Sequence, residues 1–463
     1  MPERQKGGRD AEGQESPVRE RGGAVLERQE IDTYGQAVAY IDEIPRFTSK
    51  HAMAQTQGFL HRLGDPDRKL RIIHVAGTNG KGSVCAYLRS ILEAAGYRVA
   101  LFTSPHLVCI RERFLVDGGM VTEEDFLRAF LHIYRMLDWD ALERGEEAYH
   151  PTYFEYLFFM AMVLFGEAEP DFCILETGVG GRLDATNSVN QKELTVITHI
   201  GLDHVGVLGD TLDKIAFEKA GILRAGVPAV WWDTCEETTE VFKRRAEELG
   251  ILAYSVSEND YSFSNFKRKS IDFCLRNLYD RDCTLTIHTI AAYQMENCTL
   301  AVRAIQALGA CGGIGPEQIR KGVADCFWAG RMEEVLPEVY VDGAHNEDGI
   351  RAFLETVSGD GHPGARSLLF GVARDKDYRR MIQELASSGL FGRICVTCMR
   401  SSRALEVKEL AALFGGYPDC ACEAYEDSGA AFRRLLESRG DGERIYVAGS
   451  LYLVGEIKEL LEA

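Results

Sequence analysis

The chain has 463 residues, of which 46% are hydrophobic and 27% are charged, and its formal net charge is −19. This is the composition of a globular protein that is long enough for two domains. The negative charge argues against nucleic acid or an anionic membrane as the main partner, so an anionic substrate must be held by local positive groups.

The first 28 residues are rich in Arg, Glu and Gly and poor in large apolar side chains, which predicts a disordered tail. We see no signal-peptide pattern, and no apolar run reaches the ~18 residues that a membrane span needs. The 13 cysteines are scattered without the spacing of a disulfide framework. This predicts reduced thiols and a cytoplasmic protein.

Strands and helices are predicted to alternate along the first two thirds of the chain. Helices are expected at 34–44, 52–63, 84–95, 123–137, 153–165 and 212–220, and strands at 70–75, 98–103, 171–176, 194–199 and 228–231. Continuous Val, Ile and Leu runs between helices are typical of a mostly parallel sheet that is covered on both faces.

The pattern changes after residue 250. Residues 251–292 alternate between polar and apolar, which predicts a small antiparallel excursion, and a helix is expected at 293–308. Later strands are expected at 338–341, 367–370, 393–397 and 444–448. The predicted fold is α/β: a P-loop-containing, mostly parallel sheet domain at 29–327, a linker at 328–332, and a smaller Rossmann-like α/β domain at 333–463.

A glycine-rich segment, Gly-Thr-Asn-Gly-Lys-Gly-Ser at 77–83, joins a predicted strand to a predicted helix. Such a turn aims unpaired backbone N–H groups at one point, and the helix dipole and Lys81 add positive potential there. The spacing departs from the usual phosphate loop because Gly82 separates Lys81 from Ser83. A plain glycine-rich turn with an exposed lysine is the alternative, but the strand, loop, lysine and helix together favour a phosphate cradle.

Polar residues follow several of the predicted strands. Ser104, Glu176 and His204 each come where a strand ends, and the carboxyl ends of parallel strands line the ligand crevice. We therefore expect Ser104 and His106 to lie near Lys81. Hydroxyl and carboxylate oxygens suit Mg²⁺. Ser104 alone is equally well explained as a turn serine before proline, whereas Glu176 at the end of an apolar strand would be costly unless it is paired or bound to metal.

Three residues have simple helix-end explanations. Lys219 falls in the last turn of a predicted amphipathic helix, where a cation offsets the helix dipole. Thr152 and Glu155 have the spacing of a capping box at a helix start.

Taken together, these segments resemble the Mur-type amide ligases, and within them the folylpolyglutamate synthase and dihydrofolate synthase family. The resemblance runs from about residue 30 to about residue 460. The matching segments are 77–83, 104–107, 152–155, 180–187, 201–209, 218–222, 342–346, 375–377 and 449–452. The Gly-Gly-Arg-Leu-Asp-Ala-Thr-Asn segment at 180–187 separates the folate branch from the cell-wall ligases.

The resemblance implies roles that the spacing alone does not assign. Residues that would contact ATP are Thr78, Asn79, Gly80, Lys81, Gly82 and Ser83, together with Asn297, Arg331, Asp342 and His345 across a cleft. Residues that would line the pteroate side are Thr152, Phe154, Leu183 and Ala185. Ser104 and Glu176 would bind one Mg²⁺ and His204 a second, with Lys219 carboxylated by CO₂. The implied catalytic set is Lys81, Glu176, His204 and Lys219, and a monovalent cation such as K⁺ is compatible with it.

The implied reaction is the ATP-dependent addition of L-glutamate to the γ-carboxylate of a reduced folate, through an acyl phosphate, by a monomer. Dihydrofolate synthase activity stays open: the Asp-Leu-Gly-Leu-Glu-Arg type segment of dihydropteroate-binding members has no clear counterpart, and residues 47–56 occupy its place. The alternatives are a Mur-type ligase that joins an amino acid to another carboxylate, and a protein that uses ATP only as a switch.

Overall fold

The N-terminal domain is built on an eight-stranded sheet in the order β4-β3-β2-β5-β1-β6-β7-β8. Its strands are β1 (Ile72–Ala76), β2 (Val99–Phe102), β3 (Phe114–Val116), β4 (Gly119–Met120), β5 (Phe172–Glu176), β6 (Leu194–Ile197), β7 (Ala229–Trp232) and β8 (Ala253–Val256). β3 and β4 pair in antiparallel fashion at one edge, and the other strands are parallel. Every residue of β1, β2, β5, β6 and β7 is buried, which accounts for their continuous apolar runs.

The structure is a computed structural model that describes residues 28–45, 51–144, 148–267, 269–278, 281–309, 314–417 and 421–462. The predicted tail at 1–28 lies outside these residues, apart from Arg28. No helix in the described ranges is long and apolar enough to cross a membrane. The cysteines recorded within them are free thiols, as expected.

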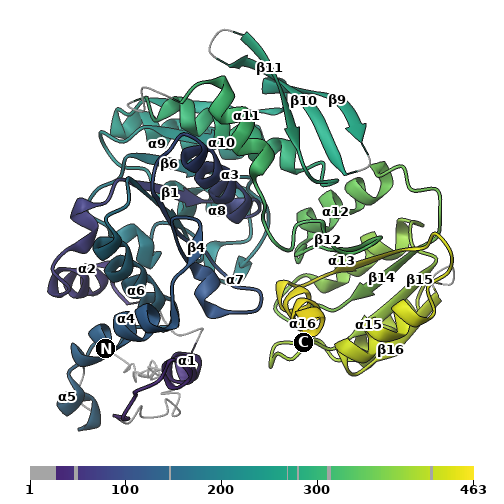
Figure 1. Ribbon diagram of the computed structural model, residues 1–463, viewed down its shortest axis with the longest axis horizontal. Helices are drawn as coiled ribbons and strands as arrows, with labels where there is room; N and C mark the ends of the chain where they lie inside the picture. Colours follow the sequence, from purple (N-terminus) through teal and green to yellow (C-terminus); the bar gives the residue numbers. More distant parts are fainter. Residues whose placement is uncertain are drawn as a thin grey trace, which may run out of the picture.

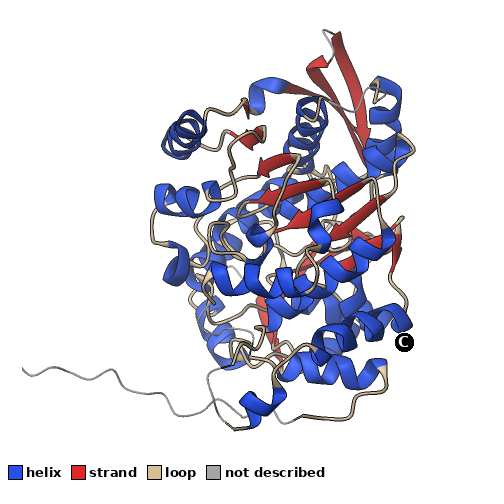
Figure 2. Cartoon of the chain, turned by 90° about the vertical axis from the view of Figure 1, so that its left-hand side faces the viewer, coloured by secondary structure: helices blue, strands red, loops and turns tan. Residues whose placement is uncertain are grey.

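Helices cover both faces of this sheet (Figures 1 and 2). They are α1 (Tyr34–Glu43), α2 (Met53–Arg62), α3 (Lys81–Ala94), α4 (Glu123–Arg135), α5 (Trp139–Glu143), α6 (Tyr153–Ala168), α7 (Val205–Leu208), α8 (Leu212–Ala220), α9 (Glu236–Leu249), α10 (Gln294–Ala307) and α11 (Pro316–Asp325). Ile72 and Ile73 are neighbours on β1 but pack into different hydrophobic clusters, the first with α4 and α6 and the second with α3 and α10. This alternation confirms the predicted two-sided packing.

The predicted antiparallel excursion is confirmed in part. β9 (Tyr261–Lys267), β10 (Ser270–Leu278) and β11 (Arg281–Ile287) form a three-stranded antiparallel sheet, which projects at the top of Figure 1. The start of the segment was assigned wrongly, because β8 pairs in parallel with β7 and completes the large sheet. Helix α9 provides the crossover that a parallel pairing requires.

The C-terminal domain has its own six-stranded sheet, in the order β12-β13-β17-β14-β15-β16. Its strands are β12 (Glu333–Leu336), β13 (Val339–Val341), β14 (Arg366–Phe370), β15 (Arg393–Thr397), β16 (Ala421–Tyr425) and β17 (Arg444–Ala448), and its helices are α12 (Glu347–Gly359), α13 (Tyr378–Ser387), α14 (Val407–Phe414), α15 (Ser428–Glu437) and α16 (Leu451–Glu462). Only β12 is antiparallel to its neighbour. The second α/β unit is thus confirmed.

A charged network stabilises this second domain. The Asp360 side chain is 0% exposed and accepts hydrogen bonds from Arg366 Nη2 (2.8 Å), Arg444 Nη1 (2.8 Å), the His362 amide (2.8 Å) and the Tyr446 hydroxyl. Burial by itself raises the pKa of Asp360, but the bonds from Tyr446, His362 and Arg366 outweigh it, so the pKa lies below its ordinary value.

We expect Asp360→Asn to lower the free energy of unfolding of this domain by about 3 kcal/mol at pH 7, because Arg366 and Arg444 lose their buried counter-charge. A depressed pKa stabilises the fold above the unfolded value of about 3.9, and this stabilisation is lost as the pH falls through the folded value. Calorimetric unfolding should therefore separate the two proteins at pH 7 and show them converging at a pH below the folded-state pKa of Asp360. An equal difference at both pH values would contradict this account.

Candidate active site

The glycine-rich loop needs its glycines for two separate reasons. Gly80 has φ +87°, and a Cβ there would lie 2.2 Å from Asn297 Oδ1; at Gly77 a Cβ would lie 1.8 Å from Thr198 Oγ1. Because Gly80 turns the chain as the N-cap, α3 begins at Lys81, earlier than the predicted residue 84. Lys81, Gly82 and Ser83 therefore belong to the first helical turn, whose N–H groups lack intrahelical partners.

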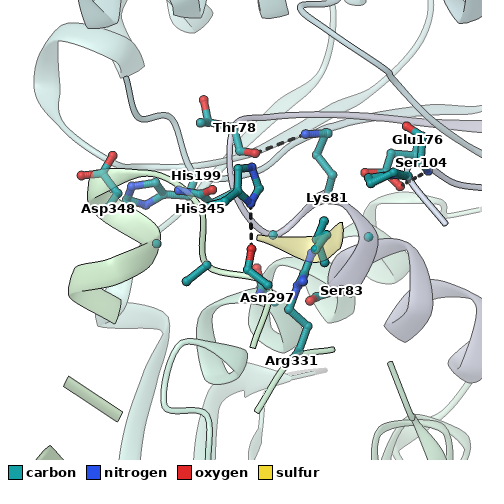
Figure 3. Close-up of a pocket in the computed structure, with 18 of the residues that line it drawn as sticks. Thr78, Lys81, Ser83, Ser104, Glu176, His199, Asn297, Arg331, His345 and Asp348 are labelled. Carbon is teal, nitrogen blue, oxygen red and sulfur yellow. Dashed lines mark hydrogen bonds between the residues drawn. The ribbon is translucent and has the colours of Figure 1, made fainter. Parts of the chain in front are cut away.

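Lys81 folds over its own loop. Its Nζ donates to the carbonyls of Gly77 (3.1 Å) and Thr78 (3.2 Å). The Thr78 and Asn79 amides in turn donate to the His199 carbonyl (2.9 and 3.3 Å), which ties the loop to the end of β6. Figure 3 shows Lys81 between Ser104 and Glu176 on one side and His199 on the other. A bound phosphate would need only to replace two carbonyl contacts of this lysine.

Trp328 is a residue whose role the sequence did not reveal. A Cβ at Gly82 would lie 2.9 Å from the Trp328 Nε1 and 3.0 Å from its Cζ2, so the indole packs directly on the phosphate loop. This contact accounts for the glycine that interrupts the usual Lys-Ser spacing. The unusual spacing was the one signal that could have pointed to a partner at this position.

A cavity of about 780 Å³ lies between the two domains. It brings together almost all predicted site residues: Thr78, Asn79, Gly80, Lys81, Gly82, Ser83, Ser104, Thr152, Phe154, Glu176, Leu183, Ala185, His204, Asn297, Arg331, Asp342 and His345. Lys219 and His106 do not line it. His106 was expected beside Lys81, but its Nδ1 instead accepts a hydrogen bond from Arg113 Nε (2.9 Å).

Glu176 is one of the buried acids that line this cavity. It is 3% exposed, and its Oε2 accepts a hydrogen bond from the Ser104 amide (3.1 Å). Burial raises the pKa of Glu176, against the opposing pull of Lys81 and the Ser104 amide. Among the described residues there is no group of three or more His, Cys, Asp or Glu side chains that could hold a metal. Mg²⁺ is commonly held by one or two carboxylates together with water and substrate phosphates, so Glu176 and the Ser104 hydroxyl beside Lys81 fit it.

His204 and Lys219 have different surroundings. His204 has φ +50°, and burial, helped by Lys376 and Lys81, lowers its pKa to about 4 despite Asp203, so its imidazole is neutral near pH 7. Lys219 is 3% exposed, and its Nζ donates to the Gly77 carbonyl (2.6 Å). Lys219 does lie in the last turn of α8, as expected, but its side chain turns inward to the phosphate loop. Its carboxylation stays a prediction.

The C-terminal domain contributes the opposite wall. Asp342 is 2% exposed and accepts hydrogen bonds from the Tyr293 hydroxyl (2.5 Å) and the amides of Met332 (2.9 Å) and Ala344 (2.8 Å). Burial raises the pKa of Asp342, and Arg331 offsets part of this effect. Tyr293 lines the cavity too and was not singled out in the sequence. Asp342 thus ties α10 to the start of the second domain.

The predicted pteroate wall begins at the start of α6. Thr152 and Glu155 form the predicted capping box, with the Thr152 amide donating to Glu155 Oε2 (2.8 Å). Glu155 also contacts His51 Nδ1 (2.7 Å) and the Thr56 hydroxyl (3.1 Å), which the sequence did not indicate. Phe154 packs so closely that a Cβ at Gly178 would lie 2.8 Å from its Cζ.

Comparison with known protein families identifies the class of enzyme to which these two domains belong. The chain matches the Mur ligase middle domain at residues 75–305 and the Mur ligase glutamate ligase domain at residues 330–451. The two domains with the cavity between them are therefore those of a Mur ligase.

The relatives narrow this class. The chain is 32% identical over 442 residues to the dihydrofolate synthase/folylpolyglutamate synthase of Bacillus subtilis (strain 168), covering 93% of this chain and 99% of that one. It is 29% identical to the folylpolyglutamate synthase of Lacticaseibacillus casei, covering 92% and 98%. The chain belongs to the folylpolyglutamate synthase/dihydrofolate synthase family.

Solved structures agree with this assignment. The folylpolyglutamate synthase of Mycobacterium tuberculosis complexed with ADP superposes with a TM-score of 0.84 at 26% identity, over 93% of this chain and 98% of that one. A complex described as FPGS with AMPPCP and folate gives 0.80 at 25% identity, over 93% of this chain and all (100%) of that one.

Proposed function

We propose that this protein is an ATP-dependent ligase that adds L-glutamate to the γ-carboxylate of a reduced folate. The observation that carries the proposal is that one cavity brings three sets of residues together. The phosphate loop lines it, and so do Thr152, Phe154, Leu183 and Ala185 of the predicted pteroate wall. The C-terminal domain adds the cationic side chains of Lys376 and Arg403. The terminal phosphoryl of ATP would pass to the folate carboxylate, giving an acyl phosphate and ADP. The glutamate amine would then attack, and phosphate would leave.

The residues that line the cavity divide into those that would bind the nucleotide and those that would hold the pteroate. Lys81 and the first-turn amides of α3 would neutralise the nucleotide phosphates, and Asn297, Arg331 and Asp342 would contact the nucleotide across the cleft. Thr152, Phe154, Leu183 and Ala185 would hold the pteroate. No protein nucleophile is required, because the reaction depends on placing the carboxylate in line with the terminal phosphoryl group and then the glutamate amine against the carbonyl carbon of the acyl phosphate.

Mg²⁺ belongs to this proposal. Ser104 and Glu176 would hold one ion and His204 a second, supported by Lys219 if that residue is carboxylated. Bound Mg²⁺ would supply charge neutralisation at the phosphates. The neutral imidazole of His204 and the buried carboxyl of Glu176 support this assignment.

Product analysis tests the reaction. ATP, Mg²⁺ and L-glutamate are supplied with tetrahydrofolate in one reaction and dihydropteroate in another, and the products are analysed by mass spectrometry. We expect a gain of one or more glutamyl units on tetrahydrofolate. A product from dihydropteroate would add dihydrofolate synthase activity, which the name of the Bacillus subtilis relative makes a second candidate.

The same reactions separate the two alternatives. A nucleotide switch would release phosphate without regard to folate or glutamate, whereas the ligase needs both. A Mur-type ligase with another acceptor would consume ATP with a muramoyl precursor and not with tetrahydrofolate. Either result would overturn the proposed function.

The proposed position of the pteroate predicts the effect of a larger side chain at Ala185. Ala185 lines the cavity and is 9% exposed, so a larger side chain must occupy space inside it. We expect Ala185→Phe to raise the KM for tetrahydrofolate at least about tenfold while the KM for ATP stays within about twofold. Steady-state kinetics with each substrate varied in turn measure both values. An equal rise in both would place Ala185 elsewhere than at the pteroate.

A further inference from the structure

Asp203 is a carboxylate of the N-terminal domain whose partners come mainly from the other domain. Its Oδ1 accepts a hydrogen bond from Lys376 Nζ at 2.6 Å, and its Oδ2 accepts one from Asn346 Nδ2 at 3.3 Å. The His345 Nε2 lies 3.7 Å from the same Oδ2. Within its own domain, the backbone amide of His204 donates to Oδ1 at 2.8 Å.

This ion pair is enclosed rather than superficial. The side chains of Asp203 and Lys376 are 9% and 10% exposed. Exposed ion pairs contribute little, but a charge left without its partner in an enclosed site is strongly unfavourable. Domain closure takes both charges out of water, and this cost is offset only where the Asp203 carboxylate and the Lys376 ammonium group meet, as they do at 2.6 Å. The pair therefore disfavours enclosed arrangements of the two domains in which these groups do not meet.

Asn346 extends the contact to the phosphate loop. Its Nδ2 donates to Asn79 Oδ1 at 3.0 Å, and Asn79 Nδ2 donates back to Asn346 Oδ1 at 3.2 Å. We call these five residues the cross-domain clasp: Asn79 and Asp203 from the N-terminal domain, and His345, Asn346 and Lys376 from the C-terminal domain. Asn79, His345 and Lys376 also line the cavity.

The backbone is shaped for this close approach. A Cβ at Gly201 would lie 1.9 Å from Asp348 Oδ2, so the loop that carries Asp203 meets the first turn of α12 with no room for a side chain. The other nitrogen of His345 is also fixed, because its Nδ1 lies 2.7 Å from the Gly343 carbonyl and must donate to it. The Nε2 thus faces Asp203.

We propose that Asp203 is a positioning residue: by pairing with Lys376 across the domain interface, it places Lys376 at the cavity wall only when the domains are closed. This inference rests on the proposed function for its kinetic consequence. Closure would complete the part of the cavity that the C-terminal domain supplies for the incoming amino acid. Nucleotide binding at the phosphate loop would be affected much less.

Asp203→Asn tests the inference because it removes the charge and keeps the shape. We expect kcat to fall about thirtyfold and the KM for glutamate to rise about tenfold, as for a misplaced binding group, with the KM for ATP within about twofold. Lys376→Met breaks the same pair from the other domain. Since the two act through one contact, the double variant should be no worse than the poorer single variant.

A matched control is the ion pair between Lys269 and Glu334. It also joins the two domains (2.5 Å), but Lys269 is 60% exposed. We expect Glu334→Gln to change each kinetic constant by less than about twofold. Effects of Asp203→Asn and Lys376→Met that multiply in the double variant, or an Asp203→Asn enzyme as active as the wild type, would overturn the inference.

Small-angle X-ray scattering gives a readout that does not depend on turnover. With AMPPCP and Mg²⁺, we expect a larger radius of gyration for Asp203→Asn than for the wild type, and no change for Glu334→Gln. Equal radii for all three would overturn the inference. If the wild type made no glutamylated folate but the radii differed as expected, the proposed function would fail while the clasp stood.

Discussion

We expect Lys81→Met to lower kcat/KM for ATP by at least about a hundredfold. The Lys81 ammonium group is fixed where negative charge develops on the transferred phosphoryl group, and such a fixed group contributes on the order of 10² to 10³ in rate. Methionine keeps most of the side-chain length but removes the ammonium group. In the described part of the chain that group donates hydrogen bonds to the carbonyls of Gly77 and Thr78, which are local to the loop, so the fold should tolerate the change. Steady-state kinetics would measure the fall in kcat/KM, and calorimetric titration with AMPPCP would measure separately how much nucleotide affinity is lost.

The control for this variant is Lys321→Met. Lys321 lies on α11, its side chain is 67% exposed, and it pairs with Asp325 one turn further along the helix. It carries the same charge at a distance from the cavity, so its loss should change kcat/KM by less than about twofold. If Lys81→Met were no more harmful than this control, the phosphate loop would not be where ATP reacts.

The sequence was sufficient for the central strands of both sheets because these strands are buried on both faces. The apolar runs alone predicted β5 and β15 to within a residue, and the helices predicted between the strands of the N-terminal domain indicated parallel pairing there. β12 and β16 were missed for the converse reason. Their residues are half-buried or exposed, and they include Glu333, Glu334 and Glu423, so they carry no clear strand signal.

The site residues could be predicted where each one lies at the end of a predicted strand or at the start of a predicted helix. The strand ends at Ser104 and Glu176 and the loop before α3 converge in one cavity because parallel strands share their carboxyl edge. Contacts between distant segments were not predictable. Trp328 against Gly82 and Tyr293 against Asp342 each join segments that only the packed domains bring together. Lys219 turned inward for the same reason, since its partner Gly77 lies far away in the sequence.

Gly80→Ala is expected to have the second large effect, and Gly96 offers a matched comparison. Both glycines have a left-handed backbone, with φ +87° and +90°, and they lie at opposite ends of α3. An alanine at either position carries a backbone cost of about 1 kcal/mol. At Gly96 nothing lies within 4 Å of the new Cβ, whereas at Gly80 it would meet Asn297 Oδ1 at 2.2 Å.

The two variants therefore separate backbone strain from steric conflict. Gly96→Ala should lose about 1 kcal/mol of unfolding free energy and keep its activity, because the strain stays far from the cavity. Gly80→Ala should lose more than this, because either Asn297 or the loop must also move, and it should raise the KM for ATP at least about tenfold. Asn297→Ala in the Gly80→Ala background removes the colliding atom but also the proposed nucleotide contact, so it should not restore ATP binding. Full recovery in that double variant would mean that Asn297 crowds the loop without contacting the nucleotide.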